Sequence, residues 1–391
     1  MTDARGLGPW VRGARRVVLK IGSSSVSDGR GAPRLELLGA VCREVDALFQ
    51  GPPRRQVVLV SSGAIALGWP RLGLKRRPSS LPEKQAAAAV GQGVLVGVYE
   101  TLLAEQGRTC AQVLLTADDL RDRKRFTHAY RTMETLLGRG VIPIVNENDT
   151  VAVDEIRVGD NDRLAAMVAV LVEADLLVIL SDVDGLYSGD PRRDPQARRI
   201  PAVAFGDALD GLVSRRASGG PMGTGGVATK LQAARMAGAA GIPTVLARAE
   251  PGVVERLFSG AAVGTFFEPA PEVLRGKKRW LAFYPRSTGA VVIDDGAAQA
   301  LVRQGRSLLA SGVVEVVGEF PAGAVVSVTD PGGQEVGRGI VRFSSDELRR
   351  ARGRHSTELA AVVSRVRTSW EVVHRDEFVA VAGGEAREKG A

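Results

Sequence analysis

Short apolar runs alternate with segments of helical periodicity over the first two-thirds of this chain of 391 residues. The apolar runs are expected strands: Val17–Ile21, Val57–Ser61, Gln112–Thr116, Val141–Val145, Leu176–Ser181 and Pro243–Ala247. The longer segments are expected helices: Arg34–Phe49, Glu83–Glu105, Lys124–Gly138, Arg163–Val172 and Ala228–Ala239. Strands that alternate with helices favour a mostly parallel sheet, because parallel neighbours are joined by helical crossovers that cover both faces. The sequence therefore predicts an α/β fold for this part.

The composition changes between residues 269 and 279, where a Pro-rich stretch runs into basic residues in a pattern typical of a linker. Short β-type runs follow at Ala290–Ile293, Val313–Val317, Ala324–Val328 and Ile340–Phe343. They predict a small all-β barrel or sandwich over residues 280–380. We thus expect a catalytic α/β domain over residues 16–268, the linker and the β domain. A flexible N-terminal arm (1–15) and a disordered tail (381–391) complete the expected organisation.

Composition argues against several classes of protein. Hydrophobic residues make up 45% of the chain, which is ordinary for a globular enzyme. No apolar run reaches the roughly 18 residues of a membrane span, and the N-terminus lacks the apolar core of a signal peptide. Cys42 and Cys110 are far apart and in no CxxC, which argues against a zinc site and fits a reducing cytoplasm. The net charge of +8 is spread along the chain, which argues against RNA as the main partner.

Polar residues gather directly after the expected strand Val141–Val145. Asn146 to Asp149 form a first cluster, and Gly159 to Asp162 form a second, just before an expected helix. Ligands of open α/β sheets bind beyond the carboxyl ends of the strands. Amides donate to carboxylates, and carboxylates accept from ammonium groups. The stretch therefore predicts a site for a small zwitterionic ligand; the alternative is a capped, solvated loop.

Two further expected strands end in residues suited to anions. Lys20 lies at the end of the first strand, and a Gly-Ser-rich loop follows whose backbone N–H groups could approach an anion. A buried ammonium without a partner is costly, so we interpret Lys20 as functional. Ser62 and Gly63 follow the second strand and precede a helix, whose N-terminus could bind carboxylate or phosphate. An ordinary Ser cap is the alternative for Ser62.

A Gly-rich loop over residues 218–230 ends at Lys230 and enters a helix. Such a loop suits covering the phosphates of a nucleotide, although GK[ST] of a Walker A motif is missing. Gly223-x-Gly225-x-x-Ala228 looks like a dinucleotide motif but follows a loop rather than a strand, so we discount it. A flexible surface loop is the alternative. Ser181 and Asp182, at another strand end, are a weak signal by themselves.

The three histidines, His128, His355 and His374, form no cluster, so any reaction is expected to need no histidine base. Phosphoryl transfer to a carboxylate fits, because a carboxylate is already ionised at neutral pH. The protein then has to align two anions and neutralise their charge with lysines, Mg²⁺ and N–H groups.

Several motifs together make a resemblance specific. The chain resembles the bacterial glutamate 5-kinases of the amino acid kinase family from Arg16 to about Phe378, including their appended PUA domain. The pair NEND…VGDND is the most specific part. The motifs that recur in order and spacing are Arg16–Ser23, Val60–Gly68, Ala89–Gln92, Gln112–Thr116, Val141–Asp162, Ser181–Tyr187 and Gly223–Leu231, followed by KRWLAF, DDGAAQAL, GRSLL and HRD.

The resemblance implies ATP-dependent phosphorylation of the γ-carboxylate of L-glutamate to L-glutamyl 5-phosphate, the first step of proline biosynthesis. It also implies feedback inhibition by proline, Mg²⁺ carried by ATP, a cytoplasmic homo-oligomer (dimer or tetramer), and channelling of the product to glutamyl phosphate reductase. Other members of the family, which act on N-acetylglutamate, aspartate, carbamate or UMP, remain alternatives. An additional RNA-binding role of the PUA-like domain also remains open, through the basic clusters Lys277–Arg279 and Arg349–Arg354.

By resemblance, Lys20 and Lys230 are the catalytic cations and Asp162 holds both in place. No protein side chain is predicted as a metal ligand. The residues implied to bind glutamate are Ser62, Gly63, Asn146, Asp149 and Asn161. The residues implied to bind the nucleotide are Lys20, Ser181, Asp182, Thr224, Gly225, Gly226, Val227, Ala228, Thr229 and Lys230. Departures from the family pattern at His128, Ser181, Val227 and Ala310 touch no proposed catalytic residue.

Overall fold

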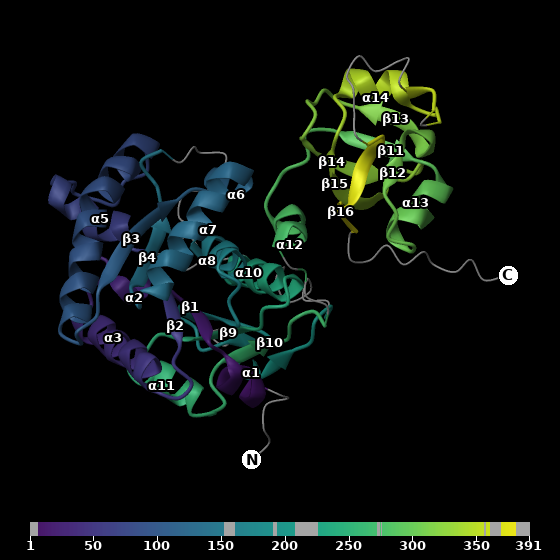
Figure 1. The fold of residues 1–391 in the computed structure, drawn as a ribbon. Helices are drawn as coiled ribbons and strands as arrows, with labels where there is room; N and C mark the ends of the chain where they lie inside the picture. The colour runs from purple at the N-terminus through teal and green to yellow at the C-terminus, as the bar shows by residue number, and fades with distance from the viewer. Residues whose placement is uncertain are drawn as a thin grey trace. The chain divides into compact units, whose positions relative to one another are not determined.

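The computed structural model describes residues 7–151, 161–190, 194–207, 226–271, 274, 276–355, 357–359 and 369–380, and Figure 1 shows the fold. The chain divides into two compact units, residues 1–273 and residues 274–391. The division falls within the range that the sequence marks as a linker. Each unit has its own hydrophobic core.

The first unit is built on an eight-stranded sheet in the order β3-β4-β2-β1-β5-β9-β10-β8. The strands from β3 to β9 are parallel, whereas β10 is antiparallel to β9 and parallel to β8. The strands are β1 (Arg16–Ile21), β2 (Gln56–Ser61), β3 (Cys110–Leu115), β4 (Ile142–Glu147), β5 (Leu176–Ser181), β8 (Ala202–Val203), β9 (Thr244–Arg248) and β10 (Thr265–Phe267), with a separate hairpin of β6 (Leu186–Tyr187) and β7 (Arg199–Ile200). The mostly parallel sheet that the alternation predicts is confirmed.

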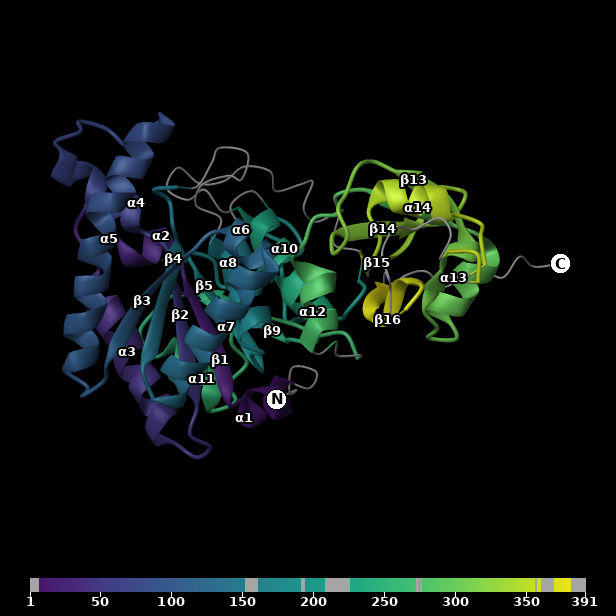
Figure 2. The same cartoon turned by 45° about the horizontal axis from the view of Figure 1, so that its top comes forward.

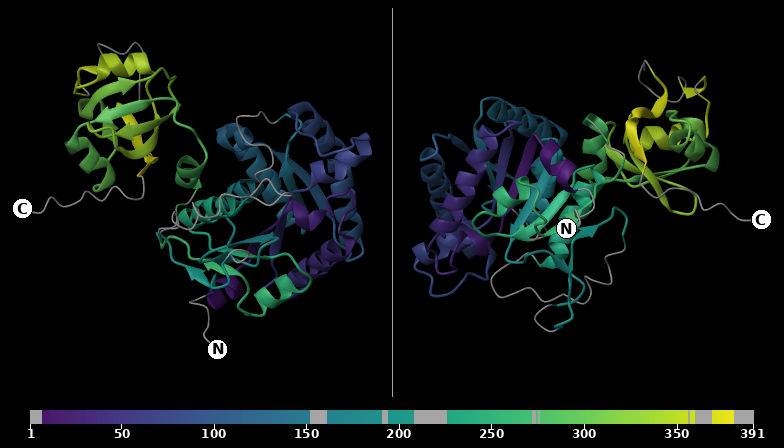
Figure 3. Two further views of the ribbon diagram at one scale, coloured as in Figure 1. Left: turned by 180° about the vertical axis from the view of Figure 1, so that it is seen from behind. Right: turned by 90° about the horizontal axis from the view of Figure 1, so that it is seen from below.

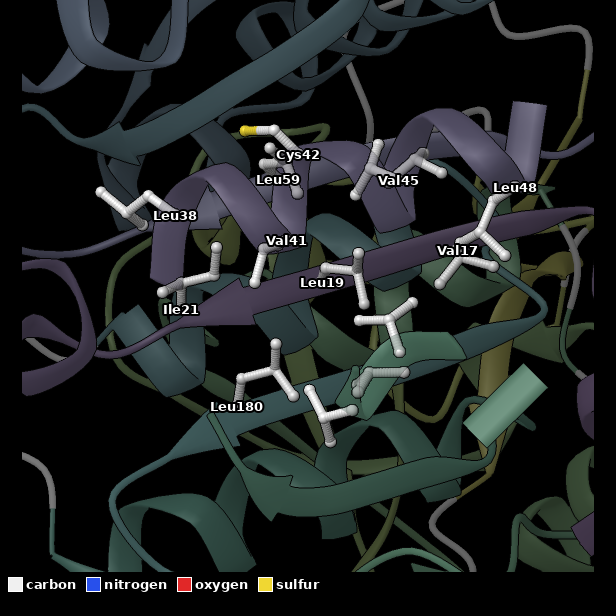
Figure 4. Packing of buried hydrophobic residues seen from close by; sticks show 14 of the residues in the cluster. Val17, Leu19, Ile21, Leu38, Val41, Cys42, Val45, Leu48, Leu59 and Leu180 are labelled. Atoms are coloured by element: carbon white, nitrogen blue, oxygen red, sulfur yellow. The ribbon is translucent and has the colours of Figure 1, made fainter. Parts of the chain in front are cut away.

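Helices cover both faces of this sheet (Figures 1 and 2). On one face, alternate residues of β1 pack against α3 in a continuous apolar cluster, where Val17, Leu19 and Ile21 meet Val41 and Val45 (Figure 4). On the other face lie α7, α8 and α10. The helices are α1 (Leu7–Gly13), α2 (Ser23–Val26), α3 (Leu35–Gln50), α4 (Ala64–Gly68), η1 (Trp69–Leu72), α5 (Leu81–Ala104), α6 (Ala117–Arg121), α7 (Arg123–Gly138), α8 (Asn161–Leu171), α10 (Val227–Ala239) and α11 (Val253–Phe258).

The expectation of a flexible arm over residues 1–15 is wrong for the described part of that range. Residues 7–13 form α1, in which Leu7 and Val11 are buried in the core together with Ala14. Leu7 and Val11 are four residues apart, so they lie on one face of the helix and remove that face from water. Residues 1–6 lie outside the described residues.

The helix α5 is long and apolar enough to cross a membrane on length and composition alone. Its Leu95, Tyr99 and Leu103 are fully buried in the core of the first unit. The core helix of a globular domain meets the same criteria, so we treat α5 as part of the α/β unit. Gly and Gln residues interrupt its sequence and hide it from a search for continuous apolar runs.

The second unit is a strand-rich domain with a curled six-stranded sheet in the order β12-β16-β15-β14-β11-β13 (Figure 3). Its strands are β11 (Ala290–Ile293), β12 (Leu308–Leu309), β13 (Val313–Val317), β14 (Val325–Thr329), β15 (Glu335–Val341) and β16 (Glu371–Ala380). The unit also has helices α12 (Gly276–Phe283), α13 (Asp295–Val302), η3 (Ala310–Gly312) and α14 (Ser345–Ala351). Ser344 and Glu347 form a capping box that starts α14. The helices are an addition to the predicted β domain.

Two glycines allow α4 and α5 to cross with their backbones in contact. A Cβ atom on Gly68 would lie 1.9 Å from the carbonyl oxygen of Ala87, and one on Gly91 would lie 1.8 Å from that of Ala64. Real Cβ atoms essentially never come this close to a backbone atom, so any other residue would force the helices apart. The crossing therefore fixes the position of the turn that precedes α4 and the position of Gln92, the residue that follows Gly91.

We predict that Gly91→Ala destabilises the protein by at least about 2 kcal/mol, because the new methyl group overlaps a backbone carbonyl. The matched control is Gly93→Ala in the same helix, where a Cβ would meet nothing within 4 Å. That variant should be neutral or more stable by up to roughly 1 kcal/mol, because Ala is a better helix former. Urea denaturation of both variants provides the measurement. Equal stabilities would contradict the close crossing.

Candidate active site

The carboxyl ends of β1, β2, β4 and β5 meet at one edge of the sheet and bring the predicted site residues together. Lys20 on β1 is in register with Val60 of β2 and Ile179 of β5. Its side chain is almost completely buried. The loop after β1 is tied to β5, because Gly22 N donates to Leu180 O at 3.2 Å. This edge is where a parallel sheet places its ligands.

Asp162, in the first turn of α8, bridges the two predicted catalytic lysines. Its Oδ1 lies 2.5 Å from Lys20 Nζ, and its Oδ2 lies 3.0 Å from Lys230 Nζ. All three side chains are buried. Burial acts to raise the pKa of Asp162, but the two ammonium groups outweigh it and hold that pKa well below its ordinary value. The carboxylate is therefore ionised, and the three groups together leave one positive charge in a buried position.

Thr229, predicted as a nucleotide contact, also touches this bridge. Its Oγ1 lies 2.9 Å from Asp162 Oδ2 and 2.9 Å from Gly226 O. The hydroxyl thus joins the first turn of α10 to the carboxylate. Lys230 follows directly, one residue further into the helix. Thr229 helps to fix the distance between the lysines, a contact that its position in a Gly-rich motif did not indicate.

A chain of amide side chains leads away from the bridge. Asn161 Nδ2 donates to Ser62 Oγ at 2.9 Å and to Asn146 Oδ1 at 3.1 Å. Asn146 Nδ2 in turn donates to Gln92 Oε1 at 2.8 Å. One network thus joins α5 to three segments that are far apart in sequence: the turn after β2, the end of β4 and the start of α8. The sequence motifs included Gln92 but assigned it no role; its polarity within an apolar helix was the available signal.

Gly63 shapes the turn between β2 and α4. Its φ of +108° is in the left-handed region that favours glycine. A Cβ atom there would also lie 2.7 Å from Val26 Cγ1. The turn brings Ser62 to Asn161, so the predicted pair of Ser62 and Gly63 is placed at the site by a backbone that other residues would strain.

Asp149 lies beyond the end of β4 beside a cavity of about 280 Å³. The cavity is lined by α5, by β3 and by the loop after β4, with Gln92, Gln112 and Asp149 among its polar members. Burial, and secondarily the negative charge of Glu147, raises the pKa of Asp149 to about 7. A buried carboxylate of this kind is suited to accept from a ligand's ammonium group, which would favour its ionised form.

The structure describes only some of the residues that are predicted to bind the nucleotide. Ser181 is buried at the end of β5, and its Oγ donates to Asp182 Oδ1 at 2.9 Å. Gly226 precedes α10, which begins with Val227 and Ala228. Thr224 and Gly225 lie outside the described residues. Their contact with a nucleotide, like that of the other residues of the set, stays a prediction.

Within the ranges that the structure describes, no group of three His, Cys, Asp or Glu side chains is placed to hold a metal ion. The carboxylate nearest to the two lysines, that of Asp162, is already engaged by both of them.

Comparisons with known proteins show the family of this chain. The model of the amino acid kinase family matches residues 15–248, and that of the PUA domain matches residues 289–363. The glutamate 5-kinase of Carboxydothermus hydrogenoformans is 47% identical over 373 residues, which covers 95% of this chain and 99% of that protein. The glutamate 5-kinase of Thermus thermophilus is 48% identical over 366 residues, which covers 93% of this chain and 97% of that protein.

The fold and these matches define the class of protein: a kinase domain of the amino acid kinase type followed by a PUA domain. A relative that is nearly half identical along nearly the whole of both chains narrows the class further. The chain belongs to the glutamate 5-kinase family of enzymes.

We predict that Asp162→Asn destabilises the fold by about 3 kcal/mol or more, because it leaves two buried ammonium groups without a counter-charge. Turnover should fall with it, since the lysines lose their fixed spacing. Asp118→Asn is the matched control: the Asp118 side chain, which pairs with Arg121, is 61% exposed, so the cost should stay below about 1 kcal/mol. Thermal and urea unfolding measure both. A stable, active Asp162→Asn variant would contradict the bridging role.

Proposed function

We propose that the protein transfers the γ-phosphoryl group of ATP to the γ-carboxylate of L-glutamate, which makes L-glutamyl 5-phosphate for proline biosynthesis. The observation that carries the proposal is the buried bridge in which Asp162 holds Lys20 and Lys230 beside a chain of amide side chains. The names of the relatives support glutamate as the substrate.

The reaction needs charge stabilisation rather than a base. The γ-carboxylate of glutamate is ionised at neutral pH. One of its oxygens forms a bond to the γ-phosphorus while the bond from that phosphorus to the oxygen shared with the β-phosphate breaks, and ADP leaves with the electron pair. Negative charge is then spread over the transferring group. Lys230 is proposed to stabilise that group, and Lys20 the bridging oxygen.

The nucleotide is proposed to bind at the end of β5 and the start of α10. Ser181, Asp182 and the run of residues 224–230 would contact ATP, and Lys20 would reach its phosphates. Mg²⁺ bound with ATP would neutralise phosphate charge and orient the phosphates. Because Asp162 is engaged by the lysines, we propose that the phosphates themselves supply most of the ligands of this ion.

Glutamate is proposed to lie along the amide chain. Its γ-carboxylate would point toward the lysines, near Ser62, Gly63 and Asn161, and its ammonium group would meet Asp149. Asn146 would hold Asn161 and the ligand in line. Glutamate carries two carboxylates and one ammonium group. The lysines at one end of the site and the carboxylate of Asp149 at the other suit such a ligand.

The pathway assignment carries further proposals. Proline, as the end product, would compete with glutamate in the same cavity as a feedback inhibitor. Acyl phosphates hydrolyse readily, so transfer of the product to glutamyl phosphate reductase would protect it from water. We also propose a cytoplasmic homo-oligomer, a dimer or tetramer, as for the family that the sequence resembles.

A substrate panel tests the proposal directly. ADP release should depend on L-glutamate and be far slower with N-acetylglutamate, aspartate, carbamate or UMP, because the first of these blocks the ammonium group and the others place their acceptor elsewhere. Added proline should raise the apparent KM for glutamate and leave kcat unchanged. Turnover supported by another acceptor and not by glutamate would refute the assignment.

The raised pKa of Asp149 predicts a pH dependence of glutamate binding. Asp149 must be ionised to accept from the ammonium group, and below about pH 7 it is increasingly protonated. The KM for glutamate should therefore rise as the pH falls, approaching about tenfold per pH unit, while the KM for ATP stays nearly constant. Kinetics between about pH 6 and about pH 8 measure this. Asp149→Asn should have a high KM at every pH; a persisting pH dependence would assign the titration to another group.

A further inference from the structure

Gln92 is held in one orientation by two constraints. The preceding residue, Gly91, is pressed against Ala64 at the crossing of α4 and α5, so this point of the helix cannot move without separating the two helices. The side-chain oxygen of Gln92 accepts from Asn146 Nδ2 at 2.8 Å. With its oxygen fixed on Asn146, the Nε2 of Gln92 has to point in another direction.

The Nε2 group of Gln92 is a buried donor, and the structure provides no hydrogen-bond partner for it among the described residues. The residue as a whole is only 9% exposed. A buried N–H group without an acceptor is unfavourable, and buried amides are normally satisfied. Gln92 also lines the cavity of about 280 Å³ beside Asp149. Its donor is therefore poised for an acceptor that enters the cavity.

Two buried acceptors around the same network also lack hydrogen-bond partners in the described part of the chain. They are Oδ1 of Asp149 and Oδ1 of Asn161. The donor of Gln92 and the acceptor of Asp149 line the same cavity and together complement the head group of an α-amino acid, which offers a carboxylate acceptor and an ammonium donor. The order of hydrogen bonds along the network determines where each end of the substrate lies. Asn161 is adjacent to Asp162 and the lysines, whereas Gln92 is two hydrogen bonds further along.

We propose that Gln92 is a substrate-binding and specificity-determining residue whose Nε2 donates to the α-carboxylate of the amino acid substrate. The proposal rests on the proposed function, in which the γ-carboxylate of glutamate lies at the lysines. Gln92 selects a substrate with a free α-carboxylate, and its bond to Asn146 couples this selection to the residues that hold the reacting end.

The first test compares substrates that differ only at the α-carboxylate. Isoglutamine carries an α-carboxamide in its place, and 4-aminobutyrate lacks the group; both keep the ammonium and the reacting carboxylate. Wild-type protein should discriminate against both analogues in kcat/KM. Gln92→Met keeps the size of the side chain and removes its donor together with the oxygen that accepts from Asn146. In this variant the KM for glutamate should rise at least about tenfold and that for 4-aminobutyrate should change much less. The discrimination should therefore collapse.

The second test reverses the preference. In Gln92→Glu the oxygen that accepts from Asn146 is retained, and the donor becomes a negative acceptor. Glutamate should bind worse because its α-carboxylate is repelled, whereas the amide N–H of isoglutamine can donate to the new carboxylate. The ratio of kcat/KM for isoglutamine to that for glutamate should rise by at least about tenfold. The KM for ATP should stay unchanged in both variants.

Gln304→Met is the matched control, because Gln304 is exposed to solvent in the second unit and does not line the cavity. It should alter no substrate ratio. If the Gln92 variants lose glutamate and the analogues equally, Gln92 only positions Asn146 and the proposal is wrong. Unchanged kinetics would also overturn it. The absence of glutamate-dependent ADP release in the wild-type protein would instead refute the proposed function. Thermal unfolding of each variant separates these results from misfolding.

Discussion

Burying two ammonium groups next to each other is costly, and the active-site edge depends on the carboxylate that makes it possible. Asp162 lies between Lys20 and Lys230 and contacts both through different oxygens. Removal of water strengthens the attraction within this bridge and also penalises any charge that is left unpaired. The end of β1 and the starts of α8 and α10 must therefore meet at one point. The bridge keeps one net positive charge, which is available to an anionic ligand.

The second constraint is the backbone contact between α4 and α5. Gly68 and Gly91 bring these helices together at the edge where the strands end. This places Ser62 on one side of the network and Gln92 on the other, joined through Asn161 and Asn146. Binding and helix packing are thus linked: the amides that contact the substrate in our proposal are fixed by a crossing at which glycine and alanine residues meet.

The two ends of the network differ in charge, and this difference gives the site its direction. Lysines lie at one end, and Asp149, with a pKa raised to about 7, lies beside the cavity at the other. In our proposal, a ligand with a carboxylate at one end and an ammonium group at the other would be oriented by this difference in charge before any chemistry occurs. The described members of the network all belong to the first unit.

The sequence by itself determined the parallel α/β sheet, because the alternation of apolar runs and helical segments allows few other arrangements. It also located Lys20, Asp149 and Asp162, because charged residues at strand ends and helix starts are conspicuous. Only the tertiary structure showed that Thr229 contacts Asp162 and that Gln92 completes the amide chain. The burial of helix α1 was likewise visible only in the tertiary structure, because two apolar residues become a buried face only when a partner helix covers them. Contacts between segments far apart in the chain depend on side-chain distances, which local sequence patterns do not contain.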